Sequence, residues 1–369
     1  MKKIMVVFGT RPEAIKMCPL IHELKSRDGV EVCVCVTGQH REQLDQVLKV
    51  FGVVPDYDLN IMIENQTLFD ITVNIISGMN RILYEDRPDI MLVHGDTTTA
   101  YASAISAFYY KIPIGHVEAG LRTYDLDAPF PEEFNRQSIA VSAKWNFAPT
   151  EWCKFNLQFE MRANKSIFVT GNTVIDAMKT TIRDDYTDEN LEWAKDSRLI
   201  LLTAHRRESI GEPLRQIFRA VRRVVYEHPD IKVIYPVHRN PAVRMNALNY
   251  LAMCPGHDRI RLIEPMDVIA FHNALARSYM VLTDSGGVQE EATALGKPTL
   301  VLREKTERPE GIDAGVLKLV GTNEQAIYEA FTELLNNNEA YEKMAHACNP
   351  YGDGHASERI ADILLEEGS

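Results

Sequence analysis

Short apolar runs alternate with helix-length amphipathic segments along most of the chain, and this alternation restricts the fold more than any other feature. Runs such as Ile4–Phe8 and Leu199–Thr203 are almost entirely apolar, which is typical of strands buried on both faces of a parallel sheet. Parallel neighbours need crossover connections, so each intervening segment is expected to be a helix that packs on the sheet. The pattern therefore predicts an α/β fold with doubly wound parallel sheets.

The expected elements form two successive cycles, and the second cycle starts at Leu199. The expected strands are Ile4–Phe8, Glu31–Thr37, Asp89–His94, Ile112–Glu118, Trp145–Ala148, Ser166–Thr170, Leu199–Thr203, Ile231–Pro236, Ile260–Ile263, Tyr279–Thr283 and Thr299–Leu302. The expected helices are Arg11–Lys25, Arg41–Phe51, Thr67–Tyr84, Thr98–Tyr110, Glu132–Ala143, Glu151–Phe159, Glu212–Glu227, Pro241–Leu251, Met266–Ser278, Gly287–Leu295 and Ala356–Leu365.

The length of 369 residues suits two domains of ordinary size. We place the boundary after Gly171, which gives an N-terminal Rossmann-like domain over residues 1–171 and a C-terminal one over residues 172–369. The polar region Asp184–Asp196 is the expected linker or surface excursion. The last helix could return to the first domain. Thr10 and Glu13 predict a capping box at the start of the first helix.

Charge and cysteine content exclude several classes of protein. The net charge of -12 argues against a nucleic-acid partner. The first apolar run ends at Gly9, too early for a signal peptide, and no stretch approaches the roughly 20 apolar residues of a membrane span. The six cysteines form no C-x-x-C pair. We therefore expect a reduced, cytoplasmic protein without a zinc site and without a membrane partner.

Side chains that can do chemistry gather after the expected strands, at the edge where open α/β sheets bind ligands. These segments are Gly9-Thr10-Arg11, Gly38-Gln39-His40, His94-Gly95-Asp96, Glu118-Ala119-Gly120, Ala204-His205-Arg206-Arg207-Glu208, His238-Arg239 and Asp284-Ser285-Gly286-Gly287. No G-x-G-x-x-G and no G-x-x-x-x-G-K-[ST] pattern accompanies them. The absence of both patterns argues against NAD-dependent and ATP-dependent enzymes.

In the first domain, the residues themselves leave alternatives open. Arg11 and Lys16 lie where the helix dipole disfavours cations, so contact with a bound anion is preferred over two plain solvated charges. Asp96 suits general acid–base chemistry or a cap for the next helix. Glu118 has no such structural role, whereas Glu132 is equally well explained as a first-turn acid.

In the second domain, the stretch TDSGGVQEEA at residues 283–292 is either a phosphate cradle or a capped turn with acidic neighbours. His205 lies within H-R-R-E, which favours phosphate contact or proton sharing over a structural histidine. His238, followed by Arg239, is a weaker candidate of the same kind. Arg308 is either an anion-binding fork or part of a mixed-charge surface loop.

Taken in order, these segments closely resemble the non-hydrolysing UDP-N-acetylglucosamine 2-epimerases. The resemblance extends from residue 9 to near residue 355. It rests on GTRPEAIK at 9–16, HGD at 94–96, HVEAGLR at 116–122, PEE at 131–133, TAHRRE at 203–208, DSGGVQEE at 284–291, ERPE at 307–310 and NPYGDG at 349–354.

The resemblance implies a glycosyltransferase-B arrangement, in which two Rossmann-like domains face a cleft that holds the nucleotide sugar. It also implies reversible C2 epimerisation of UDP-GlcNAc to UDP-ManNAc. In that reaction UDP is eliminated to leave a 2-acetamidoglucal and is then added back. The family uses no cofactor and no metal, and the resemblance suggests a homodimer.

The resemblance also assigns residues, without saying which carboxylate is the base and which is the acid. The implied catalytic residues are Asp96, Glu118, Glu132 and His205. The implied substrate-binding residues are Arg11, Lys16, Met266, Phe271, Ser285, Gly286, Gly287, Glu291 and Arg308. Glu291 is expected to bind the ribose hydroxyls, whereas Glu290, about 100° around the helix, is expected to be structural or solvated.

Bacterial members of the family are often activated by a second molecule of UDP-GlcNAc. The matching positions are Gln39, His40, Gln66, Glu132, Arg206 and His238. Two positions depart from the pattern, because Asn65 stands where arginine is common and Glu42 where glutamine is common. Activation therefore remains an open expectation.

Other functions remain open at this point: a hydrolysing epimerase that releases free ManNAc, a glycosyltransferase of the same architecture, or a nucleotide-sugar sensor. The three acidic residues Asp96, Glu118 and Glu132, expected to lie in the cleft, argue against a simple transferase. The full set of candidate catalytic groups argues against a sensor, which would need only contacts to UDP.

Overall fold

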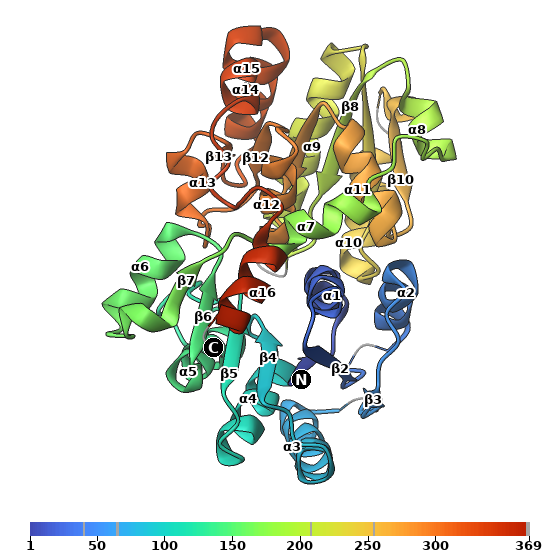
Figure 1. Ribbon diagram of the computed structural model, residues 1–369. Coiled ribbons are helices and arrows are strands. Elements are labelled where there is room, and N and C mark those ends of the chain that lie inside the picture. The colour runs from blue at the N-terminus through green and yellow to red at the C-terminus, as the bar shows by residue number, and fades with distance from the viewer. Residues whose placement is uncertain (40, 64–65, 207–208, 254, 367–369) are drawn as a thin grey trace. The chain divides into compact units, whose positions relative to one another are not determined.

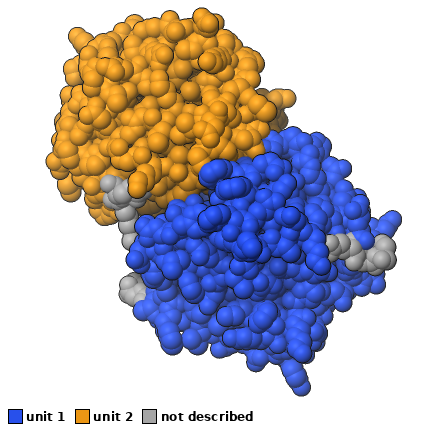
Figure 2. Space-filling view, turned by 90° about the vertical axis from the view of Figure 1, so that its left-hand side faces the viewer, with its two compact units in different colours: residues 1–180, 352–369 blue, residues 181–351 orange. Residues whose placement is uncertain are grey.

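The computed structural model describes residues 1–39, 41–63, 66–206, 209–253 and 255–366. The chain divides into two compact units (Figure 2). Unit 1 comprises Met1–Thr180 together with the C-terminal segment from Gly352, and unit 2 comprises Thr181–Tyr351.

Unit 1 contains a seven-stranded sheet with the order β3-β2-β1-β4-β5-β6-β7, in which every pair is parallel. The strands are β1 (Lys2–Phe8), β2 (Val30–Val36), β3 (Tyr57–Asp58), β4 (Ile90–His94), β5 (Ile114–Val117), β6 (Trp145–Ala148) and β7 (Ile167–Val169). All residues of the central strand β4 are buried, because helices cover both faces of the sheet (Figure 1).

The helices of unit 1 are α1 (Arg11–Lys25), α2 (Arg41–Phe51), α3 (Leu68–Glu85), α4 (Thr98–Tyr109), α5 (Glu132–Ser142), α6 (Glu151–Phe159), α7 (Thr173–Thr181) and α16 (Ala356–Glu366). The predicted capping box at α1 is confirmed. Glu13 Oε2 accepts hydrogen bonds from the N–H groups of Thr10 at 2.8 Å and Gly9 at 3.0 Å.

Unit 2 repeats this architecture with a six-stranded parallel sheet of order β10-β9-β8-β11-β12-β13. The strands are β8 (Arg198–Thr203), β9 (Ile231–Pro236), β10 (Ile260–Ile263), β11 (Met280–Thr283), β12 (Thr299–Val301) and β13 (Leu317–Leu319). The helices are α8 (Glu189–Ala194), α9 (Glu212–Glu227), α10 (Pro241–Leu251), α11 (Val268–Arg277), α12 (Gly286–Ala294), α13 (Pro309–Asp313), α14 (Glu324–Asn336) and α15 (Asn338–Ala345).

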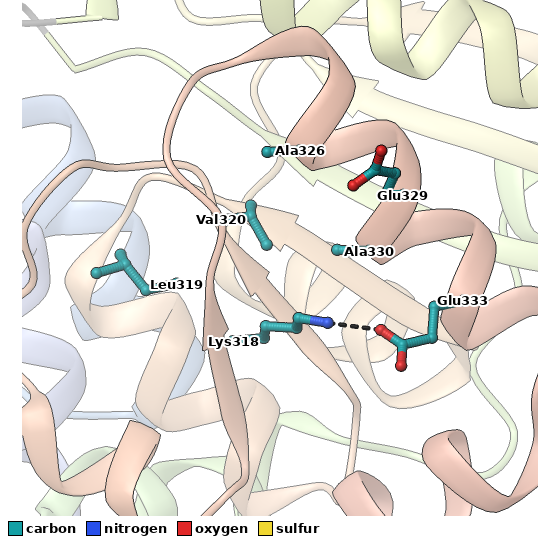
Figure 3. Close-up of a pocket in the computed structure, with 7 residues that line it drawn as sticks. All are labelled: Lys318, Leu319, Val320, Ala326, Glu329, Ala330 and Glu333. Atoms are coloured by element: carbon teal, nitrogen blue, oxygen red, sulfur yellow. Dashed lines mark hydrogen bonds and ion pairs between the residues drawn. The ribbon is translucent and has the colours of Figure 1, made fainter.

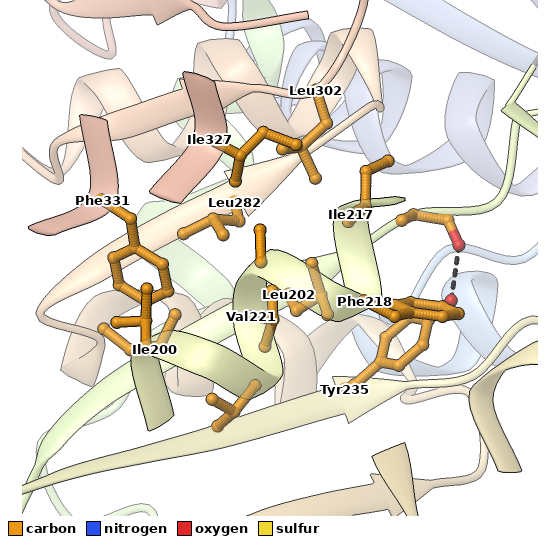
Figure 4. Packing of buried hydrophobic residues seen from close by; sticks show 14 of the residues in the cluster. Ile200, Leu202, Ile217, Phe218, Val221, Tyr235, Leu282, Leu302, Ile327 and Phe331 are labelled. Atoms are coloured by element: carbon orange, nitrogen blue, oxygen red, sulfur yellow. Dashed lines mark hydrogen bonds between the residues drawn. The ribbon is translucent and has the colours of Figure 1, made fainter. Parts of the chain in front are cut away.

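The main core of unit 2 lies between one face of its sheet and the helices α9 and α14 (Figure 4). Ile200 and Leu202 of β8 pack with Phe218 of α9 and Phe331 of α14, and all four are fully buried. The buried hydroxyl of Tyr235 donates to the carbonyl of Ala204 at 2.5 Å, which ties β9 to the end of β8.

The division between the units falls after Thr180, later than the predicted boundary at Gly171. Helix α7 stays with unit 1 because Asp176 accepts the N–H of Ser357 at 2.8 Å at the start of α16, which belongs to the same unit. The region Asp184–Asp196, expected to be a linker, contains α8, and its Leu191 is buried in a core cluster of unit 2.

Both sheets contain the strand order of a Rossmann fold, so both have a point where the order reverses. The reversal lies between β1 and β4 in unit 1 and between β8 and β11 in unit 2. The segments after these strands begin at Gly9, Gly95, Ala204 and Asp284. Within the described residues, no helix is long and apolar enough to cross a membrane.

Candidate functional site

Glu118 directly follows β5 and has a backbone conformation that few residues other than glycine adopt. Its φ is 63°, in the left-handed region, which costs a residue with a side chain about 1–3 kcal/mol. Gly120 then has a φ of 96°, and a Cβ there would lie 2.3 Å from the carbonyl oxygen of Cys153. The tight turn fixes the direction of the Glu118 side chain.

The Glu118 carboxylate is held by groups from other segments of unit 1. Oε1 accepts hydrogen bonds from Lys16 Nζ of α1 and, at 3.2 Å, from Asn172 Nδ2. Oε2 lies 3.2 Å from Nε2 of His94, the last residue of β4. The Glu118 and Lys16 side chains are only 9% and 11% exposed, so water screens their attraction weakly. The arrangement holds the carboxylate in a defined orientation beside a cation.

Two buried histidines line this edge of the sheet. Burial lowers the pKa of His94 to about 4 and the pKa of His116 to about 3. His116 Nε2 lies 2.7 Å from the carbonyl oxygen of Gly95, so that nitrogen carries the proton of the neutral ring and donates it. Both imidazoles are neutral at pH 7, and Lys16 supplies the positive charge beside Glu118.

Asp96 follows β4 and does not cap the next helix. Thr97 is the cap of α4, because its hydroxyl accepts the N–H of Ala100 at 3.0 Å. Asp96 Oδ2 instead lies 3.6 Å from Arg136 Nε. Burial raises the pKa of Asp96 to about 7, and the charge of Arg136 opposes that rise. Both charge states of Asp96 are therefore accessible near neutral pH, as acid–base catalysis requires.

The other predicted residues of unit 1 occupy helix starts. Arg11 is the first residue of α1 and Glu132 is the first residue of α5, and both are half-buried. The charges of Glu118 and Glu132 raise the pKa of Asp96, and the charge of Lys16 lowers it. The structure thus brings these predicted residues together at the carboxyl edge of one sheet.

In unit 2, Asp284 connects the ends of β11 and β8. Its side chain is fully buried, and Oδ2 accepts the N–H groups of His205 at 2.7 Å and Arg206 at 2.8 Å. Its Oδ1 is also buried and has no hydrogen-bond partner within the described ranges. Asp284 therefore fixes the segment that carries His205 beside the one that carries Ser285.

The TDSGG stretch forms the predicted turn, with Ser285 as N-cap and α12 starting at Gly286. The first N–H groups of a helix have no acceptor inside the helix, which suits a bound anion. A Cβ on Gly286 would lie 2.4 Å from Nη1 of Arg308. A guanidinium thus packs directly against the start of the helix, and this position has no room for a side chain.

Arg308 does not belong to a solvated surface loop, since the residue is only 6% exposed. Its Nε donates to Glu290 Oε1 at 2.6 Å, and its Nη1 donates to Glu307 Oε2 at 3.1 Å. Glu290 is 1% exposed. Glu290 was expected to be either structural or solvated. It is structural, because it is the buried counter-ion of Arg308.

Glu291 lies beside the buried His272 of α11, with Oε2 3.7 Å from His272 Nε2. The other ring nitrogen of His272 lies 2.6 Å from the hydroxyl of Thr181. Phe271 and Met266 are partly buried and pack against the second core cluster of unit 2. The predicted residues Met266, Phe271 and Glu291 thus lie on or next to α11 and α12.

His205 and His238 stack, with ring centroids 5.1 Å apart and planes inclined by 18°. Burial, followed by the charge of His205, lowers the pKa of His238. A predicted catalytic residue thus touches a predicted activator residue, and Arg206 is anchored next to them through its N–H.

The remaining predicted activator residues belong to unit 1. Gln39 Oε1 accepts the hydroxyl of Thr99 at 3.1 Å, and Gln66 Oε1 accepts the N–H of Ile63 at 3.3 Å. His40 and Asn65 lie outside the described residues.

The sequence assigned no role to five residues that lie against the predicted ones: His94, Arg136, Asn172, His272 and Asp284. His94 and Asp284 lie inside the quoted motifs at strand ends, and that position is a signal that could have found them. Arg136 lies one helical turn after Glu132, so helical spacing was a second signal. Asn172 and His272 have no local pattern that marks them.

A surface pocket of about 430 Å³ lies elsewhere in unit 2, between the edge strand β13 and α14 (Figure 3). Lys318 Nζ and Glu333 Oε2 form a 2.6 Å ion pair at its border. The pocket is not at the point of strand reversal and shares no residue with the site. In the described part of the chain, no three His, Cys, Asp or Glu side chains are grouped to hold a metal ion.

Comparison with known proteins agrees with this geometry. The profile of the family described as UDP-N-acetylglucosamine 2-epimerase matches residues 22–365. The UDP-N-acetylglucosamine 2-epimerase of Bacillus subtilis is 54% identical over 363 residues, which cover 98% of this chain and 95% of that protein. A crystal structure of a putative UDP-N-acetylglucosamine 2-epimerase from Listeria monocytogenes matches with a TM-score of 0.93 and 51% identity, over 100% of this chain and 97% of that one.

The Neisseria meningitidis enzyme, solved bound to UDP-GlcNAc, matches with a TM-score of 0.91 and 47% identity, over 99% of this chain and 100% of that one. MurG of Acinetobacter baumannii is only 14% identical but matches in fold, with a TM-score of 0.61 over 99% of this chain and 100% of its own. These likenesses confirm the predicted class, two Rossmann-like domains of the glycosyltransferase-B type.

Proposed function

This chain belongs to the UDP-N-acetylglucosamine 2-epimerase family, and we propose that it is a non-hydrolysing member that interconverts UDP-GlcNAc and UDP-ManNAc. The observation that carries the proposal is the Glu118 carboxylate, fixed by a left-handed backbone and by hydrogen bonds from Lys16 and Asn172. Asp96, whose pKa is raised to about 7 by burial, belongs to the same sheet edge. Epimerisation removes a proton on one face of C2 and delivers one on the other, so it needs two such groups.

The chemistry of the sugar explains why anion-binding groups are also needed. C2 lies beside an acetal carbon and not a carbonyl, so its proton is too weakly acidic for simple enolisation. We propose that the C1–O bond breaks through an oxocarbenium-like state as the C2 proton passes to a carboxylate, which leaves 2-acetamidoglucal and UDP. UDP then adds back to C1 while C2 takes a proton on its opposite face. No electrons are gained or lost overall.

We assign the C2 proton transfers to Glu118 and Asp96, with Glu132 and His205 as further catalytic residues. Departure of UDP places negative charge on the diphosphate, and preorganised cations and N–H groups stabilise such charge. The proposed substrate contacts are Arg11, Lys16, Ser285, Gly286, Gly287 and Arg308 at the diphosphate, Glu291 at the ribose, and Met266 and Phe271 on the uracil side. The UDP-GlcNAc bound to the Neisseria relative supports this substrate class.

The test is incubation with UDP-GlcNAc in D2O, followed by proton NMR of the sugar. We expect deuterium at C2 in both UDP-GlcNAc and UDP-ManNAc, with the link to UDP retained. Absence of C2 exchange refutes the proposal. Accumulation of free ManNAc instead indicates the hydrolysing reaction, and transfer of the sugar to an acceptor indicates a glycosyltransferase.

We also propose that a second UDP-GlcNAc activates the enzyme through Gln39, His40, Gln66, Arg206 and His238. The contact between His205 and His238 supports a connection between that site and the catalytic residues. The measurement is the rate of the reverse reaction from UDP-ManNAc, with and without a trace of UDP-GlcNAc. Equal initial rates would contradict activation.

We further propose a homodimer that works in the cytoplasm. Family membership supports the dimer, and a molar mass of twice 41.8 kDa by light scattering is the expected result. The thiols of Cys18, Cys33 and Cys35 are buried and form no disulfide, which is consistent with a reducing compartment.

A further inference from the structure

Arg136 of α5 lies between two carboxylates in unit 1, and the proposed reaction uses only one of them. Its Nε is 3.2 Å from Glu133 Oε2 and 3.6 Å from Asp96 Oδ2. The Arg136 side chain is 4% exposed and that of Glu133 is 0% exposed, whereas Asp96 is 28% exposed. A buried guanidinium needs a compensating charge. Glu133 supplies that charge on the buried side of the guanidinium. Asp96 lies on its more exposed side.

Glu133 is itself fixed by the segment that precedes α5. Its Oε2 accepts the N–H of Thr123 at 3.0 Å, and its Oε1 accepts the N–H of Tyr124 at 3.1 Å. Oε1 also accepts Nε2 of Gln137 at 2.7 Å. Because these donors hold both oxygens, the carboxylate cannot turn toward another partner without losing buried hydrogen bonds. Its position therefore determines where the guanidinium lies.

The same helix also holds the main chain of Asp96, since Asn135 Nδ2 donates to the Asp96 carbonyl at 2.8 Å. We propose that Arg136, ion-paired with Glu133, is a positioning residue that attracts the side chain of Asp96 and sets its charge. The catalytic consequence of this inference rests on the proposed function. The charge on Asp96, however, is a property of the protein without substrate.

Arg136 and Glu133 are expected to have opposite effects on the pKa of Asp96. Burial raises the pKa of Asp96, and among the nearby charges Arg136 has the largest effect, which lowers it. Glu118 after β5 and Glu132 on α5 raise that pKa further, and Lys16 on α1 lowers it. Glu133 partly neutralises the field of Arg136. Loss of the arginine charge should therefore raise the pKa of Asp96, and loss of the Glu133 charge should lower it.

The experiment is a titration of the protein without ligand by carbon NMR, with aspartate labelled at the carboxyl carbon and Asp96→Asn used to assign the signal. Arg136→Met should move the midpoint of Asp96 upward by about one pH unit or more, as expected for loss of a nearby charge. Arg136→Lys keeps a cation and should largely restore the midpoint. Glu133→Gln should move it downward.

Opposite shifts are the signature of the proposal, because mere structural damage gives no reason for them. Arg122→Met is the matched control: it breaks another buried pair of unit 1, in which Nη2 donates to Glu160 Oε2 at 2.9 Å. That variant should lose thermal stability and keep the Asp96 midpoint. No shift in Arg136→Met, or shifts of the same sign in both variants, overturns the proposal. If Arg136→Met does not fold, the proposal is tested by whether Glu133→Gln lowers the midpoint of Asp96.

The pH dependence of C2 deuterium incorporation connects this charge to the reaction. Its inflection should move with the NMR midpoint in each variant. A wild-type protein that does not exchange C2 refutes the proposed function but leaves the NMR titration as the test of the Arg136–Glu133 pair. An active enzyme whose inflection does not follow the midpoint shows instead that Asp96 does not govern the rate.

Discussion

At the scale of single residues, the candidate catalytic residues Glu118 and His205 are held by neighbours distant in the sequence. Glu118 depends on Lys16, which lies on the first helix of the chain, and on Asn172 near the end of unit 1. His205 depends on Asp284 through its own N–H. These contacts keep side chains in place before substrate arrives, which is how an enzyme lowers the cost of orientation.

Glu118→Gln should abolish most of the activity, because the amide keeps the shape of the carboxylate but cannot accept the C2 proton. We expect the rate of C2 exchange to fall by about 10²–10⁴-fold, the usual contribution of a general acid or base. Glu31→Gln is the control, since it removes an acid that pairs with Lys3 at 2.9 Å and is 47% exposed. Wild-type exchange in Glu118→Gln would exclude Glu118 from the proton transfer.

Gly286 and Gly287 offer a second test, because these adjacent glycines have different surroundings. A Cβ on Gly286 meets the buried guanidinium of Arg308 at 2.4 Å, whereas a Cβ on Gly287 meets only Glu291 Oε1, at 3.8 Å. Gly286→Ala should cost about 1–3 kcal/mol of unfolding free energy through overpacking. Gly287→Ala should cost far less. Urea unfolding of the two variants measures both values, and equal losses would contradict the packing argument.

At the scale of helices and strands, sequence patterns predicted most elements, but α14 was missed although its buried residues Ile327, Ala330, Phe331, Leu334 and Leu335 recur at helical spacing. Helix α9 was predicted with the observed bounds, because its apolar residues recur at helical spacing in front of a polar face. The apolar strands whose carboxyl ends lead into the candidate site residues were also predicted. Helix α8 was missed because it has only six residues within a polar region, and β13 because it has only three.

The candidate site was predicted only in part, for a related reason. Residues that follow strands, such as Asp96 and His205, are visible in the sequence because parallel strands end at one edge. The partners of these residues are not visible in the sequence. Contacts such as that of Asn172 with Glu118 form only when elements distant in the sequence pack together. Of the two roles left open for Asp96, the structure excludes the helix cap, since Thr97 occupies that position.

Asp176 of α7 should control whether the C-terminal helix α16 stays folded on unit 1. Its carboxylate accepts the N–H groups of Ser357 at 2.8 Å and Ala356 at 3.3 Å, which places it at the helix start as an N-cap would be. Loss of such a cap costs about 0.5–2 kcal/mol. In Asp176→Ala we expect faster amide exchange across α16, measured by mass spectrometry.

Asp353→Ala is the control for this prediction. Asp353 lies in the same C-terminal segment and pairs with Arg359 at 2.7 Å, but its side chain is 56% exposed. Exposed pairs contribute little, so the exchange of α16 should change less than in Asp176→Ala. Unchanged exchange in Asp176→Ala would show that the contacts of α16 with α1 suffice without the cap.

At the scale of the whole molecule, each unit has its own core, its own parallel sheet and its own point of strand reversal. Each unit carries a different part of the candidate site, and unit 1 also carries the cations Arg11 and Lys16. Unit 1 carries the carboxylates Asp96 and Glu118, whereas unit 2 carries the helix start at Gly286 and the guanidinium of Arg308. Parts of the substrate should therefore protect different parts of the chain.

Hydrogen exchange with two ligands tests this division. UDP carries the groups assigned to unit 2, and its diphosphate is also assigned to Arg11 and Lys16 of unit 1, but it has no GlcNAc sugar. It should therefore protect amides at 203–206 and 283–291 and leave 114–120, the segment assigned to that sugar, unchanged. UDP-GlcNAc should add protection at 114–120, where Glu118 is expected to meet C2. At a ligand concentration of 100 times Kd, binding adds about 2.7 kcal/mol of stability, enough for a clear signal. Uridine, which lacks the diphosphate, should give much weaker protection at 283–291. Equal protection of 114–120 by UDP and by UDP-GlcNAc would contradict the assignment of that segment to the sugar.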